Sequence, residues 1–221
     1  MATNDQDINL KLEILPKSTS KAFAHLTQQV WINKNGWYLA GGTALALQMG
    51  HRLSVDLDFF TTEDDFNIEN LISSLTPQGW VTSLREKGTL YGELNNTKIS
   101  FISYPYFSPK EPFVRYGNIN ILDSKDIAVM KVIAISQRGR KRDFIDLYWY
   151  SKNKESLADI IKRIGEQYPN VEHSYHHILK SLTYFDEADV DPNPQLLLPI
   201  SWDEVKLYFL GQIPQLGQQL L

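Results

Sequence analysis

Two adjacent glycines, Gly41 and Gly42, separate a short apolar run at 37–40 from a second apolar run at 43–49. The first run has the length of a strand, so the pattern predicts a strand, a tight turn and then a helix. A third apolar stretch at 53–60 alternates in polarity, which is typical of a buried strand. A strand–turn–helix–strand unit brings the glycine turn and the end of the second strand to one edge of a sheet.

The glycine turn has two interpretations. Glycines let a backbone approach a phosphate closely, and free N–H groups at a helix start attract anions, so this turn is a candidate phosphate-binding loop. The plainer alternative is a tight turn in which glycine supplies a positive φ angle. Thr43, which follows the glycines, either caps the helix or contacts a phosphate.

Asp56 and Asp58 are the second candidate group. On a strand, their i, i+2 spacing places both carboxylates on one face. Neighbouring carboxylates repel each other unless a cation lies between them, and Mg²⁺ accepts carboxylate oxygens while leaving positions for phosphate oxygens. Two such ions can hold the attacking and leaving oxygens of a phosphoryl transfer. The alternative is two solvated aspartates at a strand edge.

Lys131 is the one polar residue in the apolar run 127–135. A lysine in a buried helix is costly unless its charge is paired or its stem reaches solvent. Pairing with a phosphate or with the aspartates, and simple extension to solvent, are both open interpretations. Arg138 follows seven residues later on roughly the same helical face.

Asp143 and Asp146 are spaced i, i+3 and share a face of the next predicted helix. The functional interpretation makes them a base for an attacking hydroxyl or groups that orient Lys131. The structural alternatives are a helix N-cap for Asp143 and an ion pair with Arg142 for Asp146.

Charge is unevenly distributed along the chain. The 221 residues carry a formal net charge of −4, which argues against a surface that binds nucleic acid everywhere. The segment 125–142 nevertheless holds six basic residues and one acidic residue. This segment is either a solvated basic loop or a local contact for a polyanion.

Several classes of protein are excluded. The chain has no cysteine, which removes disulfide scaffolds, thiol catalysis and cysteine-ligated metals. The first residues do not have the pattern of a signal peptide, and no apolar run approaches the roughly 18 residues of a membrane span. We therefore expect a soluble cytoplasmic protein without a membrane partner. The histidines at 173, 176 and 177 lack metal-site spacing and are expected on a polar surface.

The chain is predicted to be α+β, with a small mixed or antiparallel sheet flanked by helices and a helical C-terminal part. Turn signals favour an antiparallel meander of strands at 80–86, 89–94 and 98–104, and a strand at 119–122 follows. We expect an α/β core at 1–122 and a mainly helical part at 123–221 that completes the cleft. Helices are expected at 18–30, 66–75, 124–137, 144–151, 157–168 and from 201 to about 210, with a loop at 189–194.

Four segments in order resemble the motifs of the AbiEii/AbiGii nucleotidyltransferase toxin family, within the DNA polymerase β-like nucleotidyltransferase superfamily. They lie at 38–47, 52–59, 131–138 and 141–147. The resemblance extends over roughly residues 15–150. Four ordered motifs are far more specific than any one of them.

The resemblance implies a Mg²⁺-dependent enzyme that moves a nucleotide from an NTP to an acceptor hydroxyl and releases pyrophosphate. By this likeness Asp56 and Asp58 hold Mg²⁺, Lys131 contacts the triphosphate, and Asp143 or Asp146 serves the reaction with the acceptor. RNA, and tRNA in particular, is the candidate acceptor, and an antitoxin protein is the candidate partner of a toxin. The residues expected to bind the nucleotide are Gly41, Gly42, Thr43, Arg52, Ser54 and Arg138.

Two features depart from the superfamily pattern. The glycine motif ends in Thr43 where many members have serine, and Ser100 stands where many carry a third metal-binding carboxylate. Glu93 on the preceding predicted strand is a weak substitute for that acid. The alternative function is therefore a nucleotide- or RNA-binding module whose catalytic site has decayed.

Overall fold

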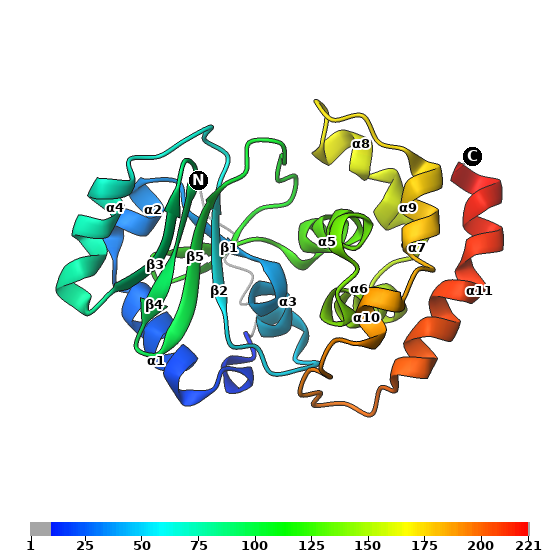
Figure 1. Cartoon of the computed structure of the whole chain (residues 1–221), viewed down its shortest axis with the longest axis horizontal. Coiled ribbons are helices and arrows are strands. Elements are labelled where there is room, and N and C mark those ends of the chain that lie inside the picture. Colours follow the sequence, from blue (N-terminus) through cyan, green and yellow to red (C-terminus); the bar gives the residue numbers. More distant parts are fainter. Residues whose placement is uncertain (1–9, 221) are drawn as a thin grey trace, which may run out of the picture.

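A seven-stranded mixed sheet forms one half of the molecule. The computed structural model describes residues 10–220, and its strands gather on the left of Figure 1. The sheet order is β3-β4-β5-β2-β1-β7-β6. The β2–β5 and β1–β7 pairs are parallel and the other pairs are antiparallel, which confirms the predicted mixed sheet. The strands are β1 (Tyr38–Ala40), β2 (Leu57–Thr61), β3 (Val81–Glu86), β4 (Thr89–Leu94), β5 (Thr97–Ser103), β6 (Val114–Tyr116) and β7 (Ile119–Ile121).

Helices accompany the sheet and form the other half of the molecule, on the right of Figure 1. Those of the sheet half are α1 (Lys17–Leu26), α2 (Val30–Lys34), α3 (Gly41–Met49) and α4 (Ile68–Leu75), with 3-10 turns at Leu12–Ile14 and Thr76–Gln78. Those of the helical half are α5 (Ser124–Arg138), α6 (Lys141–Asn153), α7 (Leu157–Lys162), α8 (Ile164–Gln167), α9 (Tyr175–Ser181), α10 (Asp186–Asp189) and α11 (Trp202–Leu220).

The two faces of the central strands β2 and β5 carry different side chains: one face is buried in the core and the other carries polar residues. Phe59 of β2 and Phe101 of β5 are fully buried and stack with ring centroids 5.2 Å apart, and Trp37 packs edge-on against Phe101. Because side chains alternate along a strand, Asp58 and Ser100 point to the opposite face. One face therefore builds the core and the other is available for a site.

A single buried core joins the two halves. It includes Leu39 of the sheet, Leu45 of α3, Ile127 of α5 and Phe144 of α6. Helix α3 lies between the strands and α5 and α6 in Figure 1, and it packs against elements on both sides. Within residues 10–220, no helix is long and apolar enough to cross a membrane.

The meander of β3, β4 and β5 was predicted correctly because its turns are encoded locally. Gly88 and the consecutive residues Asn95 and Asn96 adopt the positive φ angles that tight hairpin turns require. The resulting register places Asp58 directly beside Ser100 across the parallel β2–β5 pair.

Several element boundaries were wrong. The helix expected at 18–30 is two helices, because the chain turns at Thr27, whose hydroxyl bonds the Ala24 carbonyl. The strand expected at 53–60 begins at Leu57, since the N–H groups of residues 53 and 54 bond the carbonyls of Gln195 and Ile14. The helix expected at 157–168 is divided into α7 and α8, and the one expected at 201–210 continues to Leu220. The short elements β6, α9 and α10 were not anticipated.

Candidate active site

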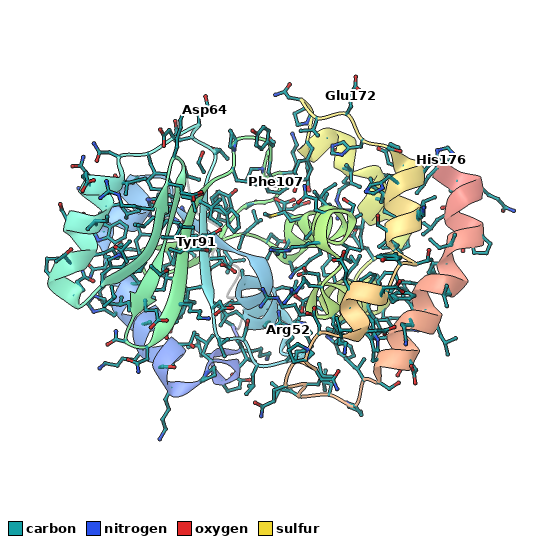
Figure 2. All side chains as sticks on the ribbon, in the orientation of Figure 1. Arg52, Asp64, Tyr91, Phe107, Glu172 and His176 are labelled. Carbon is teal, nitrogen blue, oxygen red and sulfur yellow. The ribbon has the colours of Figure 1, made fainter. Side chains whose placement is uncertain are left out.

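The predicted site residues meet at a cavity of about 570 Å³ between the sheet and the helical half. Its walls come from the start of α3, from the site-facing side of β2, β4 and β5, and from α5 and α6. Figure 2 labels Tyr91, which lies over the strands, and Arg52, which lies below α3. Both residues line the cavity.

Asp56 and Asp58 both face this cavity. Asp58 lies within β2 and accepts a 2.6 Å hydrogen bond from the Ser100 hydroxyl. Asp56 precedes the strand, so the expectation that both aspartates lie on it was wrong for Asp56. The Asp56 carboxylate is one-third exposed and lies 3.5 Å from Nη1 of Arg142.

The electrostatics of Asp58 favour a cation at this position. Burial raises the pKa of its carboxyl group, the Ser100 hydrogen bond opposes that rise, and the charge of Asp56 adds to it. A divalent cation between the two carboxylates would relieve their repulsion. Two carboxylates beside an open cavity match the preference of Mg²⁺ for few protein oxygens and several positions for phosphate or water.

A third acidic ligand does not complete the pair. Ser100 occupies the neighbouring position on β5, and Glu93 lines the cavity from β4 with an exposed side chain. Across the part of the chain that the structure describes, no group of three acidic or histidine side chains is placed to hold a metal. The residues present therefore fit a metal site whose remaining ligands come from a substrate.

Both positions of the glycine turn require glycine, because a side chain at either one would collide with a neighbouring residue. Gly41 has a φ of +69°, and a Cβ there would lie 2.9 Å from Oδ2 of Asp58. A Cβ on Gly42 would lie 2.3 Å from Nη2 of Arg52. The positive φ interpretation is thus confirmed at Gly41, and α3 begins directly at the cavity.

Thr43 fixes the segment that carries the aspartates. Its buried hydroxyl donates to the carbonyl of Asp56 and lies 2.7 Å from the Ser54 hydroxyl. Ser54 also accepts a 3.2 Å hydrogen bond from Nη1 of Arg52. Thr43 therefore does not cap α3, for which no side-chain cap is present.

Lys131 is paired within the protein. Its ammonium lies 2.6 Å from Oδ1 of Asp143 and 2.7 Å from Oδ2 of Asp146, and its side chain is 6% exposed. The alternative in which the lysine extends to solvent is wrong. Lys131 also lines the cavity, so its charge is held rigidly at the edge of the site.

Asp146 is the centre of a buried ionic network. Nε and Nη2 of Arg52 lie 2.7 and 2.9 Å from its two oxygens, and Nε2 of His51 lies 2.7 Å from Oδ1. Burial alone would raise the pKa of Asp146, but the Arg52 and Lys131 cations and the hydrogen bonds from His51 and Arg52 hold it well below its ordinary value. The suggested Asp146–Arg142 ion pair is not formed, because Arg142 faces Asp56.

Asp143 differs from Asp146 in having a free oxygen. Both aspartates are buried, but Asp143 lines the cavity and Asp146 does not. Among the described residues, the buried Oδ2 of Asp143 has no hydrogen-bond partner, and Nε of Arg138 lies 3.7 Å from it. Asp143 lies in the first turn of α6 and not at its N-cap, which is Arg140.

The basic segment contains buried cations and half-exposed cations, and the half-exposed cations are also ion-paired: Arg138 with Asp143, Arg140 with Asp191 and Arg142 with Asp56. Lys125 pairs with Glu111, and Lys141 is buried with its ammonium on the Asp191 carbonyl and the Asn193 side chain. The half-exposed cations are Arg138, Arg140 and Arg142. Arg138 and Arg142 line the main cavity, while Arg140 and Arg142 line an adjoining cavity of about 260 Å³ that shares Asp56 with it.

Two groups of residues were missed by sequence reasoning. His51 was given no role, but its ring is fully buried against Asp146. An apolar wall of the cavity, formed by Phe60, Ile102 and Met130, was not identified. Strand alternation could have found Phe60 and Ile102, because they share the face of Asp58 and Ser100.

The mixed sheet and its helices have the fold of solved nucleotidyltransferases, and the glycine turn, the paired carboxylates and the Lys131–Asp143 pair lie at one cavity of that fold. The family model described as "Nucleotidyl transferase AbiEii toxin, Type IV TA system" matches residues 32–85 and 98–215. The chain belongs to this AbiEii nucleotidyltransferase toxin family, as the sequence motifs predicted.

Relatives and solved structures agree with this assignment. An uncharacterized protein of Aquifex aeolicus (strain VF5) is 37% identical over 194 residues, covering 82% of this chain and 88% of that protein. A crystal structure described as a candidate nucleotidyltransferase from H. pylori has a TM-score of 0.55 at 16% identity, covering 92% of this chain and 96% of that chain. The MenT4 nucleotidyltransferase toxin from Mycobacterium tuberculosis H37Rv has a TM-score of 0.52 at 13% identity, with 92% and 89% covered. At these identities, the structural similarity shows the shared fold.

Proposed function

We propose that this nucleotidyltransferase moves a nucleoside monophosphate from an NTP to a hydroxyl group of an acceptor, with Mg²⁺ as cofactor and pyrophosphate as the second product. The observation that carries the proposal is the convergence of the glycine turn, Asp56, Asp58 and Lys131 on one cavity. Its volume of about 570 Å³ is typical of a site for a molecule of nucleotide size.

Each group has a role that follows from its geometry. The N–H groups at the start of α3 bind triphosphate oxygens, because they direct positive charge into the cavity. Lys131 contacts the triphosphate from the cavity wall, where Asp143 and Asp146 fix the position of its ammonium. Asp56 and Asp58 are the residues that would hold Mg²⁺, which supplies charge neutralisation at the reacting phosphate. Catalysis in such a site consists mainly of positioning and charge stabilisation.

Asp143 is assigned the role of general base for the acceptor hydroxyl. Its free Oδ2 accepts the proton of the attacking hydroxyl as the new oxygen–phosphorus bond forms and the bond to pyrophosphate breaks. Asp146 keeps Lys131 and Arg52 in place, so we assign it a positioning role. Arg52 and Ser54, which were predicted to bind nucleotide, are assigned the same role because their polar groups bond within the protein.

The acceptor is proposed to be RNA, with tRNA as the leading candidate. Arg138, Arg140 and Arg142 present half-exposed guanidinium groups at the two adjoining cavities, each beside one aspartate, and such groups suit the phosphates of a polyanion. The family description and the MenT4 similarity support a toxin whose activity a partner antitoxin counteracts, and we place both proteins in the cytoplasm. Growth arrest on expression, relieved by a neighbouring gene product, would test that role, and harmless expression of an active enzyme would refute it.

Transfer of label from each of four α-labelled NTPs to total tRNA in the presence of Mg²⁺ tests the reaction. We expect Asp56→Ala and Asp58→Ala to lower transfer by at least about a hundredfold, since each removes charge stabilisation at the reacting phosphate. Asp64→Ala is the matched control, because this aspartate is exposed at the top of Figure 2, away from the cavity. A wild-type protein that binds no NTP and labels no RNA or protein would contradict the proposal.

One observation favours a second candidate, a nucleotide-binding module without turnover. Ser100 occupies the position beside Asp58 that a third carboxylate could take. Calorimetry distinguishes the two functions. NTP binding that survives Asp58→Ala without turnover supports the module, whereas metal-dependent binding with pyrophosphate release supports the enzyme.

A further inference from the structure

A further cavity of about 460 Å³ lies on a neighbouring face of α5. Lys131, Ala134 and Arg138 of this helix line the main cavity, while Ile133, Ser136 and Gln137 line the further one. Its other walls come from the segment after β5 and from the chain between α8 and α9. In Figure 2 this region lies at the top, between the labelled residues Phe107 and Glu172.

The walls are unusually aromatic. Tyr104, Tyr106 and Tyr168 line the cavity, with centroids of the Tyr104–Tyr106 and Tyr104–Tyr168 pairs 6.1 and 6.2 Å apart and both pairs nearly perpendicular. Tyr106 is 59% exposed, and no aromatic ring of the described residues stacks on it in parallel. Its ring is thus an open face on which a planar group can stack.

Polar groups at the cavity lack partners. Nε2 of His173 is buried and, among the described residues, has no hydrogen-bond partner, while the His173 ring is held edge-on to Tyr168 at 5.6 Å. The Gln137 side chain is exposed and makes no hydrogen bond with another described residue. By contrast, Nε2 of His177 already bonds the Ser136 carbonyl at 3.0 Å. His173 and Gln137 therefore remain for a ligand.

An arginine connects this cavity to the active site. Arg138 follows Gln137 directly, lines the main cavity and has a 60% exposed side chain. Its charge also reaches Tyr104, where it opposes the rise in pKa that burial causes. An anionic group bound by Arg138 would lie between the two cavities.

We propose that the further cavity binds a nucleobase, stacked on Tyr106 and hydrogen-bonded at its polar edge by His173 and Gln137, with Arg138 on the attached phosphate. A planar ring with a polar edge satisfies both the open tyrosine face and the unpaired nitrogen, whereas an aliphatic ligand would leave the nitrogen unpaired. A metal ion does not fit, since no metal-binding cluster exists among the described residues. The biological meaning of this site rests on the proposed function, in which both the NTP and the RNA acceptor carry bases.

Binding without Mg²⁺ and without turnover tests the site. Binding of the four nucleoside monophosphates is measured by saturation-transfer NMR. Binding of ATP and of CTP is measured by calorimetry, and binding of a 5′-fluorescein single-stranded oligoribonucleotide is measured by fluorescence anisotropy. We expect Tyr106→Ala to weaken binding of at least one probe about tenfold through lost stacking. His173→Phe keeps an aromatic ring at this position and removes both imidazole nitrogens, so it should change the preference among the four bases.

The matched control is Tyr184→Ala, which removes a half-exposed tyrosine outside the cavity and should leave binding unchanged. Weaker NTP binding in Tyr106→Ala assigns the site to the NTP base, and weaker oligonucleotide binding with unchanged NTP binding assigns it to an acceptor base. Unchanged binding of every probe in both variants overturns the proposal. A protein that transfers no nucleotide but loses base binding in Tyr106→Ala would refute only the proposed reaction.

Discussion

At the scale of single residues, the glycine turn is limited by atoms that belong to the site. Alanine at position 41 would combine a left-handed backbone with a 2.9 Å contact to Asp58, and alanine at 42 would displace the Arg52 guanidinium from Asp146. The left-handed conformation alone costs a residue with a Cβ about 1–2 kcal/mol. These positions therefore require glycine whether or not a phosphate binds.

We expect Gly41→Ala to lower the free energy of unfolding by about 1–2 kcal/mol and to reduce nucleotide transfer more strongly than stability. Urea unfolding and the transfer assay measure the two effects. Gly211→Ala is the control, since nothing lies within 4 Å of its added Cβ in α11, and a gain of about 0.5–1 kcal/mol is expected there. A fully stable and active Gly41→Ala protein would contradict this account of the turn.

Asp146 should be more important for stability than for chemistry. Its removal leaves the buried Arg52 without its carboxylate, and such changes typically cost about 3–5 kcal/mol. We expect Asp146→Ala to lose stability of this order in urea unfolding, with Asp64→Ala as an exposed control. A loss below about 1 kcal/mol would show that the network is relaxed or solvated.

The same group gives a pH dependence. The pKa of Asp146 is lower in the folded state than in the unfolded state, so the folded state binds fewer protons there. Its contribution to stability is full above the ordinary aspartate pKa of about 4 and is lost as the pH falls below it. Unfolding measured between about pH 6 and pH 3 should therefore be less pH-dependent in Asp146→Ala than in the wild type. An equal dependence of unfolding free energy on pH in the two proteins would contradict the lowered pKa of Asp146.

At the scale of elements, the turn between α5 and α6 determines which cations of the basic segment are exposed. Of its cations, Arg140 is half-exposed beside Asp191 and Arg142 is half-exposed beside Asp56, whereas Lys141 is buried. The sequence predicted the excess of charge but not which cations are available. That distinction depends on the loop at 191–193, which contacts α6 from distant positions in the chain.

Arg140→Ala and Arg142→Ala should each weaken RNA binding across sequences and lower the slope of log affinity against log salt by about 1. Fluorescence anisotropy over a range of salt concentrations measures both quantities. Arg115→Ala on β6 provides an exposed arginine away from the cavities. Equal effects of all three substitutions would indicate binding through net charge alone.

Elements with local signals were predicted well. The hairpin turns at Gly88 and Asn95 determine the meander, and the apolar period of α5 determines a long helix. The start of β2 was missed because residues 53 and 54 bond to Gln195 and Ile14, which no local pattern reveals. The short helices α9 and α10 have too few turns for a periodic signal.

At the scale of the whole molecule, the predicted division into 1–122 and 123–221 remains a prediction about organisation. The two parts share a core, and Arg52 of the first part pairs with both Asp146 and Leu196 of the second. We expect neither part to fold alone, because separation would expose the Arg52 network and the face of α3 that packs on α5.

Expression of the two parts separately, with amide NMR spectra and urea unfolding of each, tests this expectation. The full chain should show one cooperative transition, and each part should lack one. A dispersed spectrum and a cooperative transition for either part would identify it as an independent domain.

The amino-acid sequence by itself determined the order of the motifs and the α+β class, because these depend on residues close together along the chain. The tertiary structure set Asp58 beside Ser100, because the β2–β5 pairing joins strands that are far apart in sequence. Only the tertiary structure decided the partners of the charged groups. Arg52 bonds an aspartate 94 positions away, and Asp143 keeps a buried oxygen without a hydrogen-bond partner among the described residues. Local periodicity cannot predict such pairs, because the path of the whole chain determines which buried charges meet.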